Sequence, residues 1–462
     1  MIRIFRHYVS TAYLSLLLAE SGVLLTAIFI GGHLRFLHEK EWQVEPDWWI
    51  TAFLFALTMV ICNAALGLYQ RSACSFETAG LFLRLSTSFL LGTVAMSLVF
   101  YAFPALFLGR GVFGFALLFA LFVSLGIRLG FRRFIDSQRL KRRILVLGVG
   151  ENARRILEYR QKLPQASLNF VGFVPMGEAS CQVAPEDLIE LEVPLREFVE
   201  REDIDEIVVA PDDRRRGLPV DELLDCKMQG VEVVDLLTFF EREAGIVKID
   251  CLSPGWLVFS DGFKMKSSLV VKRLFDIAVS LMLLTFAWPV MLLTALAIWI
   301  EDRGKHPVFY RQTRVGEDWK CFQLIKFRSM RPDAEKDGAR MASPDDKRVT
   351  RVGRFIRKTR IDELPQLWNV LKGEMSFVGP RPERPEFVER FAETIPYYQE
   401  RLRVKPGITG WAQVRYAYAE NEADTLEKLQ YDLYYVKNYS LFLDFLILLQ
   451  TVEVVLWGKG AR

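Results

Sequence analysis

Long apolar stretches alternate with charged connections over the first third of the chain. Four of these stretches are long enough to cross a bilayer as helices, and they occupy residues 9–32, 48–69, 79–103 and 111–131. Arginines precede the first stretch and follow the fourth, whereas the first connection contains several acids. Because positively charged connections remain in the cytoplasm, residues 1–135 are predicted to form a four-helix transmembrane bundle with both ends on the cytoplasmic side.

Two polar side chains, Glu20 and Asn63, lie within these apolar stretches. A polar residue inside a membrane either marks a functional site or pairs with a neighbouring helix. We expect Glu20 and Asn63 to make polar contacts within the bundle.

The pattern changes at residue 140, where short apolar runs alternate with helical stretches. Strands are expected at 143–147, 169–174, 206–210 and 231–235, and this alternation predicts a parallel α/β sheet over residues 140–250. The first strand leads into Gly148-x-Gly-x-x-Ala153, which is the beginning of a Rossmann-like unit. The second strand has no acid after it for a ribose hydroxyl, so we expect a structural or regulatory domain and no NAD.

A second apolar region follows a predicted linker at residues 251–268. The segment 277–300 contains no charged residue and is long enough for a fifth membrane crossing. Basic residues flank both of its ends, however, and a crossing would translocate one of these clusters. Pro289 at its midpoint removes a helical hydrogen bond and can bend the helix. We therefore predict a re-entrant helix over about 270–301, in which the hydroxyl of Thr285 or Thr294 satisfies the freed backbone groups.

Basic residues dominate the next segment. Between Arg303 and Arg360 there are 17 Lys or Arg and 7 Asp or Glu, and arginines recur at helical spacing at positions 348, 351, 354 and 357. A strand is expected at 320–325. Such an excess of positive charge either contacts anionic lipid headgroups or binds an anionic substrate such as a diphosphate.

Two adjacent acids, Asp362 and Glu363, follow this basic segment. The apolar positions after them have helical spacing, and Pro365 suits the first turn of a helix. The acids would then lie near the positive end of a helix dipole, which favours ionised carboxylates and bound phosphate. Gly379-Pro-Arg381-Pro predicts a rigid turn that holds Arg381 in one direction. The acids alone would fit a simple helix cap; acids, arginines and a helix start together indicate phosphoryl chemistry.

Composition narrows the class of protein. The 462 residues allow two or three domains, and 51% hydrophobic beside 25% charged residues indicates a membrane part joined to a soluble part. A net charge of +3 is too small to suggest a nucleic-acid partner. The six cysteines are scattered, which suits a reducing compartment and gives neither a zinc site nor a disulfide framework.

Six ordered motifs occur in the last 200 or so residues: Lys272-Arg-x-x-Asp276, Lys326-Phe-Arg-Ser-Met330, Asp362-Glu-Leu-Pro-Gln-Leu-x-Asn-Val-Leu-Lys-Gly373, Met375-Ser-Phe-Val-Gly-Pro-Arg-Pro382, Val404-Lys-Pro-Gly-Ile-Thr-Gly-Trp-Ala-Gln-Val414 and Tyr431-Asp-x-Tyr-Tyr435. Residues 269–462 thereby resemble the polyprenyl-phosphate hexose-1-phosphate transferases, which are also called bacterial sugar transferases or monotopic phosphoglycosyl transferases. The N-terminal helices and the Rossmann-like unit resemble the large subclass of this family. The resemblance implies a membrane protein of α plus α/β class whose C-terminal catalytic domain is mostly helical.

The resemblance also implies a mechanism. Asp362 would attack the β-phosphate of a UDP-sugar and release UMP, and undecaprenyl phosphate would then take the sugar phosphate from the aspartyl intermediate. The resemblance implies that Asp362 and Glu363 are the catalytic residues and that they also bind Mg²⁺. The residues expected at the substrate or its phosphates are Lys326, Arg328, Arg357, Arg381 and Asp432. The donor expected is UDP-glucose or UDP-galactose, although no motif encodes the sugar.

The resemblance further predicts where the protein acts. It implies a protein of the bacterial inner membrane that has its catalytic domain on the cytoplasmic face and works as a dimer. Its product would begin the assembly of an exopolysaccharide or O-antigen-type glycan.

Two other functions fit parts of the chain. A non-catalytic scaffold for polysaccharide assembly would not need the acid pair and the phosphate-binding arginines, and these are intact. A membrane-anchored nucleotide-sugar dehydratase or epimerase would need a Tyr-x-x-x-Lys pair, and no tyrosine in the chain is followed by a lysine four residues later.

The last apolar segment, residues 440–457, is interrupted by Asp444, Gln450 and Glu453. This pattern predicts an amphipathic helix that lies either in the membrane interface or in the domain core. Aromatic residues that could anchor in the interface or contact the sugar precede it: Tyr397, Tyr398, Trp411, Tyr416 and Tyr418.

Overall fold

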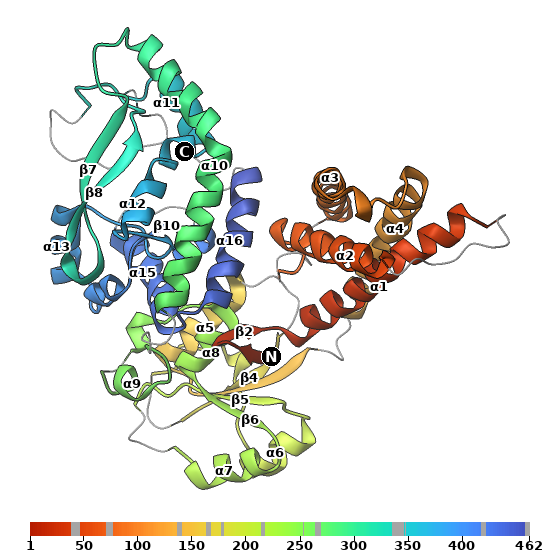
Figure 1. The fold of residues 1–462 in the computed structure, drawn as a ribbon. Helices are drawn as coiled ribbons and strands as arrows, with labels where there is room; N and C mark the ends of the chain where they lie inside the picture. The colour runs from red at the N-terminus through yellow and green to blue at the C-terminus, as the bar shows by residue number, and fades with distance from the viewer. Residues whose placement is uncertain are drawn as a thin grey trace. The chain divides into compact units, whose positions relative to one another are not determined.

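The chain forms two compact units. The computed structural model describes residues 1–37, 47–70, 77–135, 141–162, 168–176, 180–213, 218–252, 254–263, 269–334, 346, 348–416 and 422–457. One unit contains residues Val9–Ala244 with Met1–Ile2, and the other contains Gly245–Arg462 with Arg3–Tyr8 (Figure 1). The first holds the segments expected to form the four-helix and Rossmann-like parts, and the second begins close to the boundary predicted at residue 250.

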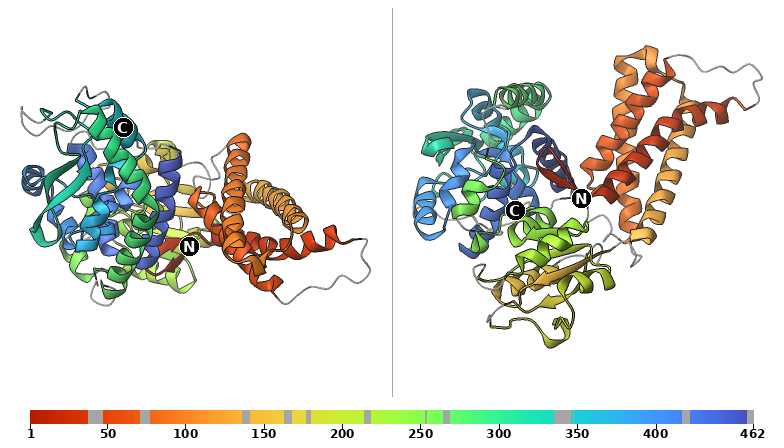
Figure 2. Two further views of the ribbon diagram at one scale, coloured as in Figure 1. Left: turned by 45° about the horizontal axis from the view of Figure 1, so that its top comes forward. Right: turned by 90° about the horizontal axis from the view of Figure 1, so that it is seen from below.

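Four long apolar helices form at the predicted positions. They are α1 (Thr11–Arg35), α2 (Trp48–Ala65), α3 (Thr78–Ala102) and α4 (Arg110–Ile135). Each is long and apolar enough to cross a membrane, and their facing sides bury a common apolar core that includes Leu24, Phe55 and Met59. Figure 2 draws them in red to orange, running alongside one another in the right-hand view. Their orientation in a membrane stays a prediction.

Glu20 and Asn63 join these helices to one another. Arg128 Nη2 on α4 lies 2.6 Å from Glu20 Oε2, to which the Tyr69 hydroxyl also donates. The Ser88 hydroxyl on α3 donates to Asn63 Oδ1 over 2.7 Å. Buried polar groups need such partners because water cannot reach them. The prediction that both residues make contacts between helices is confirmed.

The predicted parallel sheet is also confirmed. Its strands are β3 (Arg142–Leu147), β4 (Leu168–Val174), β5 (Glu206–Val209) and β6 (Glu232–Asp235). They are arranged in the order β4-β3-β5-β6, and every pair is parallel. The helices between them are α5 (Glu151–Lys162), α6 (Leu195–Arg201) and α7 (Val220–Met228), and α8 (Leu236–Ala244) follows β6. Side chains alternate across a sheet, so Leu145 and Leu147 face the core with α6 and α7.

The glycine turn after β3 is filled by a side chain of the protein itself. The carboxylate of Asp212 accepts hydrogen bonds from the backbone N–H groups of Glu151 and Asn152, both over 2.9 Å. A Cβ at Gly150 would lie 2.0 Å from Asp212 Oδ2, so a larger residue there would displace this carboxylate. The carboxylate thus takes the place at the start of α5 where a phosphate binds in dinucleotide sites.

The second unit combines short strands with helices, and the buried apolar residues that the structure describes there form three clusters. Its strands are β7 (Phe309–Val315) and β8 (Cys321–Phe327), which are antiparallel, and β9 (Ser376–Val378) and β10 (Gly407–Thr409), which are parallel. Its helices are α9 (Pro254–Phe259), α10 (Leu269–Glu301), α11 (Arg351–Lys358), α12 (Gln366–Lys372), α13 (Pro385–Thr394), α14 (Trp411–Arg415), α15 (Glu422–Lys437) and α16 (Leu441–Leu456). The strand expected at 320–325 is β8, and α9 lies within the segment predicted as a linker.

Helix α10 runs through Pro289 without a break in its secondary structure. Figure 1 shows that it changes direction along its length. The hydroxyl of Thr285 donates to the backbone oxygen of Leu281 over 2.9 Å. The prediction that this hydroxyl bonds a backbone group left without a partner by Pro289 is therefore wrong for Thr285. Re-entry into a membrane stays a prediction.

Helix α16 contributes one face to the core of the second unit. Leu443 and Ile447 are fully buried there, whereas Phe445, Val455 and Leu456 remain about half exposed. The alternative of a core helix therefore holds for one face of α16. The other face is apolar and exposed, as in helices that lie in a membrane interface.

Candidate active site

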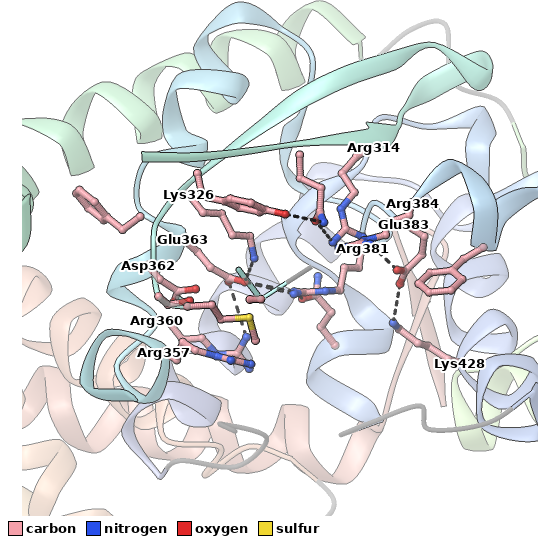
Figure 3. Close-up of a pocket in the computed structure, with 18 of the residues that line it drawn as sticks. Arg314, Lys326, Arg357, Arg360, Asp362, Glu363, Arg381, Glu383, Arg384 and Lys428 are labelled. Atoms are coloured by element: carbon pink, nitrogen blue, oxygen red, sulfur yellow. Dashed lines mark hydrogen bonds and ion pairs between the residues drawn. The ribbon is translucent and has the colours of Figure 1, made fainter. Parts of the chain in front are cut away.

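A cavity of about 560 Å³ lies in the second unit beside the β7–β8 hairpin. Residues of this hairpin, of the turn η7 (Ile361–Glu363), of the 379–384 loop and of α15 form its wall (Figure 3). Eleven Lys or Arg side chains line it against four acids, which are Asp362, Glu363, Glu383 and Asp432. Such a wall suits a ligand with several negative charges.

The two adjacent acids lie in a short 3₁₀ turn. Arg360, directly before it, has a left-handed backbone with φ 60°, a conformation that costs energy for a residue with a side chain and is common at functional sites. Helix α12 starts at Gln366, with Pro365 as its N-cap. The acids were predicted at the start of a helix, but they lie in the turn before α12, which has only seven residues. The electric field at the two carboxylates therefore comes mainly from neighbouring charged side chains.

Glu363 is surrounded by cations. Its Oε1 accepts from Lys326 Nζ over 2.9 Å and from Arg381 Nη1 and Nη2 over 3.4 Å. Arg360 Nη1 lies 3.8 Å from Oε2. Burial raises the pKa of this carboxyl, but Lys326, Arg381 and Arg360 lower it by more, so that its pKa lies well below the ordinary value. Glu363 is therefore ionised at neutral pH and fixes Lys326 and Arg381.

Asp362 has the opposite environment. Its side chain is almost fully buried, and its carboxylate makes no hydrogen bond or ion pair with any residue that the structure describes. Burial, with the charge of Glu363, raises the pKa of Asp362 to about 6, although Lys326 and Arg357 oppose this shift. An anion without a hydrogen-bond partner in a positively charged cavity is a reactive nucleophile.

Arg381 is held from behind by a buried ion pair. Arg401 Nη2 donates to the backbone oxygen of Arg381 over 3.0 Å and lies 2.8 Å from Asp432 Oδ2. The turn itself is clamped between β9 and β10, because Gly379 N donates to Thr409 O. A Cβ at Gly379 would meet Lys405 O at 2.3 Å, which explains the glycine. The prediction of a fixed Arg381 is confirmed, and Asp432 supports the site through Arg401.

A group of charged residues at the other end of the cavity was not predicted from the sequence. Glu383 lies 3.4 Å from Arg314 Nη1 and 3.6 Å from Lys428 Nζ, and these groups come from three separate elements. Tyr398, one of the aromatic residues predicted from the sequence to anchor in the interface or contact the sugar, is buried and lines the cavity beside them. Isolated charged residues in a sequence give no indication that they will form ion pairs in the folded chain. Only the position of Glu383 next to the Gly-Pro-Arg-Pro turn could have indicated this group.

The predicted basic segment contributes only in part. Arg357 and Arg348 line the cavity, whereas Arg351 and Arg354 are exposed on α11 and do not. Arg328 is at the wall of the cavity, but its Nη2 is paired with Asp302 over 2.9 Å. Arg357 makes no hydrogen bond or ion pair within the described residues, so its guanidinium is available to a ligand.

The first motif, Lys272-Arg-x-x-Asp276, attaches α10 to the unit. Lys272 Nζ lies 2.6 Å from Asp444 Oδ2 on α16, and Asp276 Oδ1 accepts from Phe377 N over 3.0 Å. Arg273 donates to the backbone oxygens of Val370 and Leu371, at the end of α12. Its role is therefore to cap the helix that follows the two acids.

A magnesium ion would find one free carboxylate here. Within the described ranges, no group of three or more His, Cys, Asp or Glu residues could hold a metal ion. Mg²⁺ commonly binds one or two carboxylates and completes its shell with water and substrate phosphates. Asp362 fits that role, whereas the oxygens of Glu363 are already shared among cations. The donor set therefore suits a Mg²⁺ ion that is bound together with a diphosphate.

Comparison with known proteins places the site in a family. Residues 267–458 match the model described as bacterial sugar transferase. The UDP-N-acetylgalactosamine-undecaprenyl-phosphate N-acetylgalactosaminephosphotransferase of Aeromonas hydrophila is 45% identical over 242 residues, which cover 52% of this chain and 56% of that protein. The UDP-glucose:undecaprenyl-phosphate glucose-1-phosphate transferase of Xanthomonas campestris pv. campestris is 32% identical over 354 residues, or 72% and 70% of the two chains.

A third relative is named for another sugar. The undecaprenyl-phosphate galactose phosphotransferase of Salmonella typhimurium is 41% identical over 215 residues, which cover 42% of each chain. The chain spans about half the length of the first of these relatives. The three relatives share the lipid acceptor in their names and differ in the sugar.

Proposed function

Because the chain belongs to the bacterial sugar transferase family, we propose that it transfers a sugar 1-phosphate from a UDP-sugar to undecaprenyl phosphate and releases UMP. The product, undecaprenyl-diphosphate-sugar, would start the assembly of a surface glycan. The observation that carries this proposal is the buried Asp362 carboxylate, which has no partner among the described residues and lies beside Lys326 and Arg357 in a cationic cavity.

In the proposed reaction, a carboxylate oxygen of Asp362 attacks the β-phosphorus of the donor. The bond from that phosphorus to the bridging oxygen breaks, and the electron pair leaves with UMP. A phosphate oxygen of undecaprenyl phosphate then attacks the same phosphorus and releases the Asp362 carboxylate. Each step exchanges one P–O bond for another, so it needs no oxidant or reductant.

The Lys and Arg side chains of the cavity have separate roles in the proposed reaction. Lys326 and Arg381 are already oriented by Glu363, which lets them meet the β-phosphate without a further ordering cost. We assign Arg357 to bind the phosphate of the leaving UMP. Glu363 serves as a positioning residue, because its low pKa makes it a poor proton acceptor.

We also propose that Mg²⁺ takes part, bound by Asp362 or by both acids together with the donor diphosphate. The ion would neutralise charge on the diphosphate. The residues that line the cavity would still orient the phosphates and exclude water.

The contacts of α10 support the membrane arrangement that we propose. Its first turns contact β9 and α16, and Ile298 near its end packs with Phe327 and Ile356 of the same unit. Contacts of both ends with the same unit support re-entry over a crossing. Phe286 and Leu293, between the ends, are more than two-thirds exposed and apolar, as lipid contact requires. UDP-sugars are cytoplasmic, so we place the site on the cytoplasmic face of the inner membrane.

The sugar is the open part of the proposal. The relatives named above carry N-acetylgalactosamine, glucose and galactose in their names, so UDP-N-acetylgalactosamine joins UDP-glucose and UDP-galactose as a candidate donor. Measuring UMP release from each of the three, with undecaprenyl phosphate present, would identify the donor.

A labelling experiment tests the covalent step. The purified full chain is given a UDP-sugar that carries ³²P in the β-phosphate, without lipid acceptor. We expect the protein to retain label after denaturation and the Asp362→Asn variant to retain none. Equal labelling of both proteins would refute the aspartyl intermediate, while transfer to undecaprenyl phosphate by the unsubstituted chain would still support the overall reaction.

A further inference from the structure

The segment before the first apolar helix forms a small hairpin. Strands β1 (Ile2–Ile4) and β2 (His7–Val9) pair with each other, and the two residues between them, Phe5 and Arg6, have left-handed backbones with φ 44° and 69°. Glycine and asparagine are the usual residues in such a turn, and a two-stranded hairpin alone is barely stable in water. The hairpin therefore depends on contacts outside itself.

These contacts come from the second unit. His7 Nδ1 and the Tyr434 hydroxyl form a hydrogen bond of 2.9 Å. The imidazole also meets the Trp411 ring edge to face, with centroids 5.6 Å apart and an interplanar angle of 82°. Phe5 lies against Phe442, with ring centroids 5.9 Å apart. Trp411 and Tyr434 are almost completely buried, so His7 inserts between core side chains.

The contacted residues lead toward the proposed site. Trp411 begins α14, and Gln413 in the same helix accepts a hydrogen bond from Arg381 over 3.3 Å. The Trp411 indole N–H donates to Gly245 O, where the second unit begins. The hairpin thus packs behind the helix that contacts the arginine of the cavity.

We propose that Arg3–Tyr8 forms an intramolecular clasp that is an integral part of the second unit. Only Val9 and Ser10 separate the clasp from α1. Because the clasp and the second unit are then on the same side of the membrane, the chain between them crosses an even number of times. An even number of crossings agrees with the topology that the basic residues predict. It is inferred independently of those residues and of the reaction that the site performs.

A cross-linking experiment in native membranes tests the clasp. The photoreactive residue p-benzoylphenylalanine replaces Phe5 in the full chain, and heavy-isotope and ordinary copies are co-expressed before irradiation. We expect a link between the N-terminal peptide and the peptide that contains Phe442, within copies of one isotope. The same residue at Phe355, which is 62% exposed on α11 near the end of α10, serves as the control and should not react with the Phe442 peptide, because α16 contacts the first turns of α10.

Two outcomes would overturn the proposal. Links between heavy and ordinary chains would show that a second copy supplies the hairpin. Links from position 5 to lipid only, or to other parts of the chain, would show that the segment does not dock.

Substitution of His7 adds a second measurement in the same cross-linking background. His7→Leu removes the bond to Tyr434, and we expect the ratio of docked to undocked chains reported by the link to fall about fivefold, as for one hydrogen bond of ordinary strength. His7→Asn places a polar atom close to the position of Nδ1 and should retain most of the link. Equal link yields in His7→Leu and the unsubstituted chain would contradict the role of His7.

Discussion

The substitution Asp362→Asn should abolish activity and stabilise the fold at the same time. Ionisation of Asp362 is disfavoured by burial and by Glu363, which raise its pKa from 3.8 to about 6. At 1.36 kcal/mol for each pKa unit, the ionised carboxylate costs the folded state about 3 kcal/mol. Asparagine has nearly the same shape and carries no charge, so it avoids this cost.

The sign depends on pH. For an acid whose pKa is raised on folding, the cost is absent below the unfolded pKa of 3.8 and complete above about 6. We therefore expect the stabilisation by Asp362→Asn at pH 8 and little change at pH 4. For a domain of about 200 residues, 3 kcal/mol corresponds to a rise in Tm of roughly 6 to 12 °C.

Thermal unfolding of the full chain in detergent, followed at pH 8 and pH 4, measures this effect. Asp261→Asn replaces an exposed acid and provides the matched control, for which we expect no pH-dependent gain. A Tm for Asp362→Asn that is lower than that of the unsubstituted chain at pH 8 would refute the reasoning. The carboxylate would then be stabilised by its surroundings, in conflict with a nucleophile kept without partners.

Four further expectations concern the same site. Glu363→Gln should lower stability at neutral pH by about 1–3 kcal/mol because it removes the carboxylate that pairs with the partly buried Lys326 and Arg381; the contribution of Glu363 is present above its ordinary pKa of 4.5 and lost as pH falls, so the difference in Tm between the variant and the unsubstituted chain should narrow in acid. The rate of UMP release should fall as pH drops through about 6, where Asp362 becomes protonated, and a flat profile from pH 5 to 7 would contradict this assignment. Arg357→Ala should raise KM for the UDP-sugar with little change in Tm, since the side chain has no partner in the part of the chain that the structure describes; a large loss of Tm would show a structural role. Arg273→Ala should lower Tm because two carbonyls at the end of α12 lose their donor, and Arg273→Lys should restore part of the loss.

The sequence was sufficient for the elements whose signals are local. Apolar stretches of membrane length, alternating strand patterns and the glycine turn depend on neighbours in the chain, and the helices α1–α4 and the strands β3–β6 form where these signals predict. The boundaries of the site helix were less predictable. The strained backbone of Arg360 separates α11 from the acids, and strain of this kind is imposed by packing rather than by local preference.

The candidate site shows the same division. Asp362, Glu363, Lys326 and Arg381 belong to ordered motifs, so the sequence could name them together. Arg401 carries no comparable sign, because its role is to bond the backbone of a residue 20 positions earlier. The expectation for Arg328 was incomplete for a similar reason, since Asp302 meets its guanidinium only in the folded chain.

By itself, the sequence determined which residues carry charge, how the apolar stretches are spaced and which family the motifs resemble. Only the tertiary structure decided how the two adjacent acids differ. Asp362 and Glu363 have similar carboxyl groups, but Lys326 and Arg381 reach the second and leave the first without a partner. Their pKa values move in opposite directions because a charge in a buried site responds to distances of a few ångströms, and such distances are set by residues far apart in the chain.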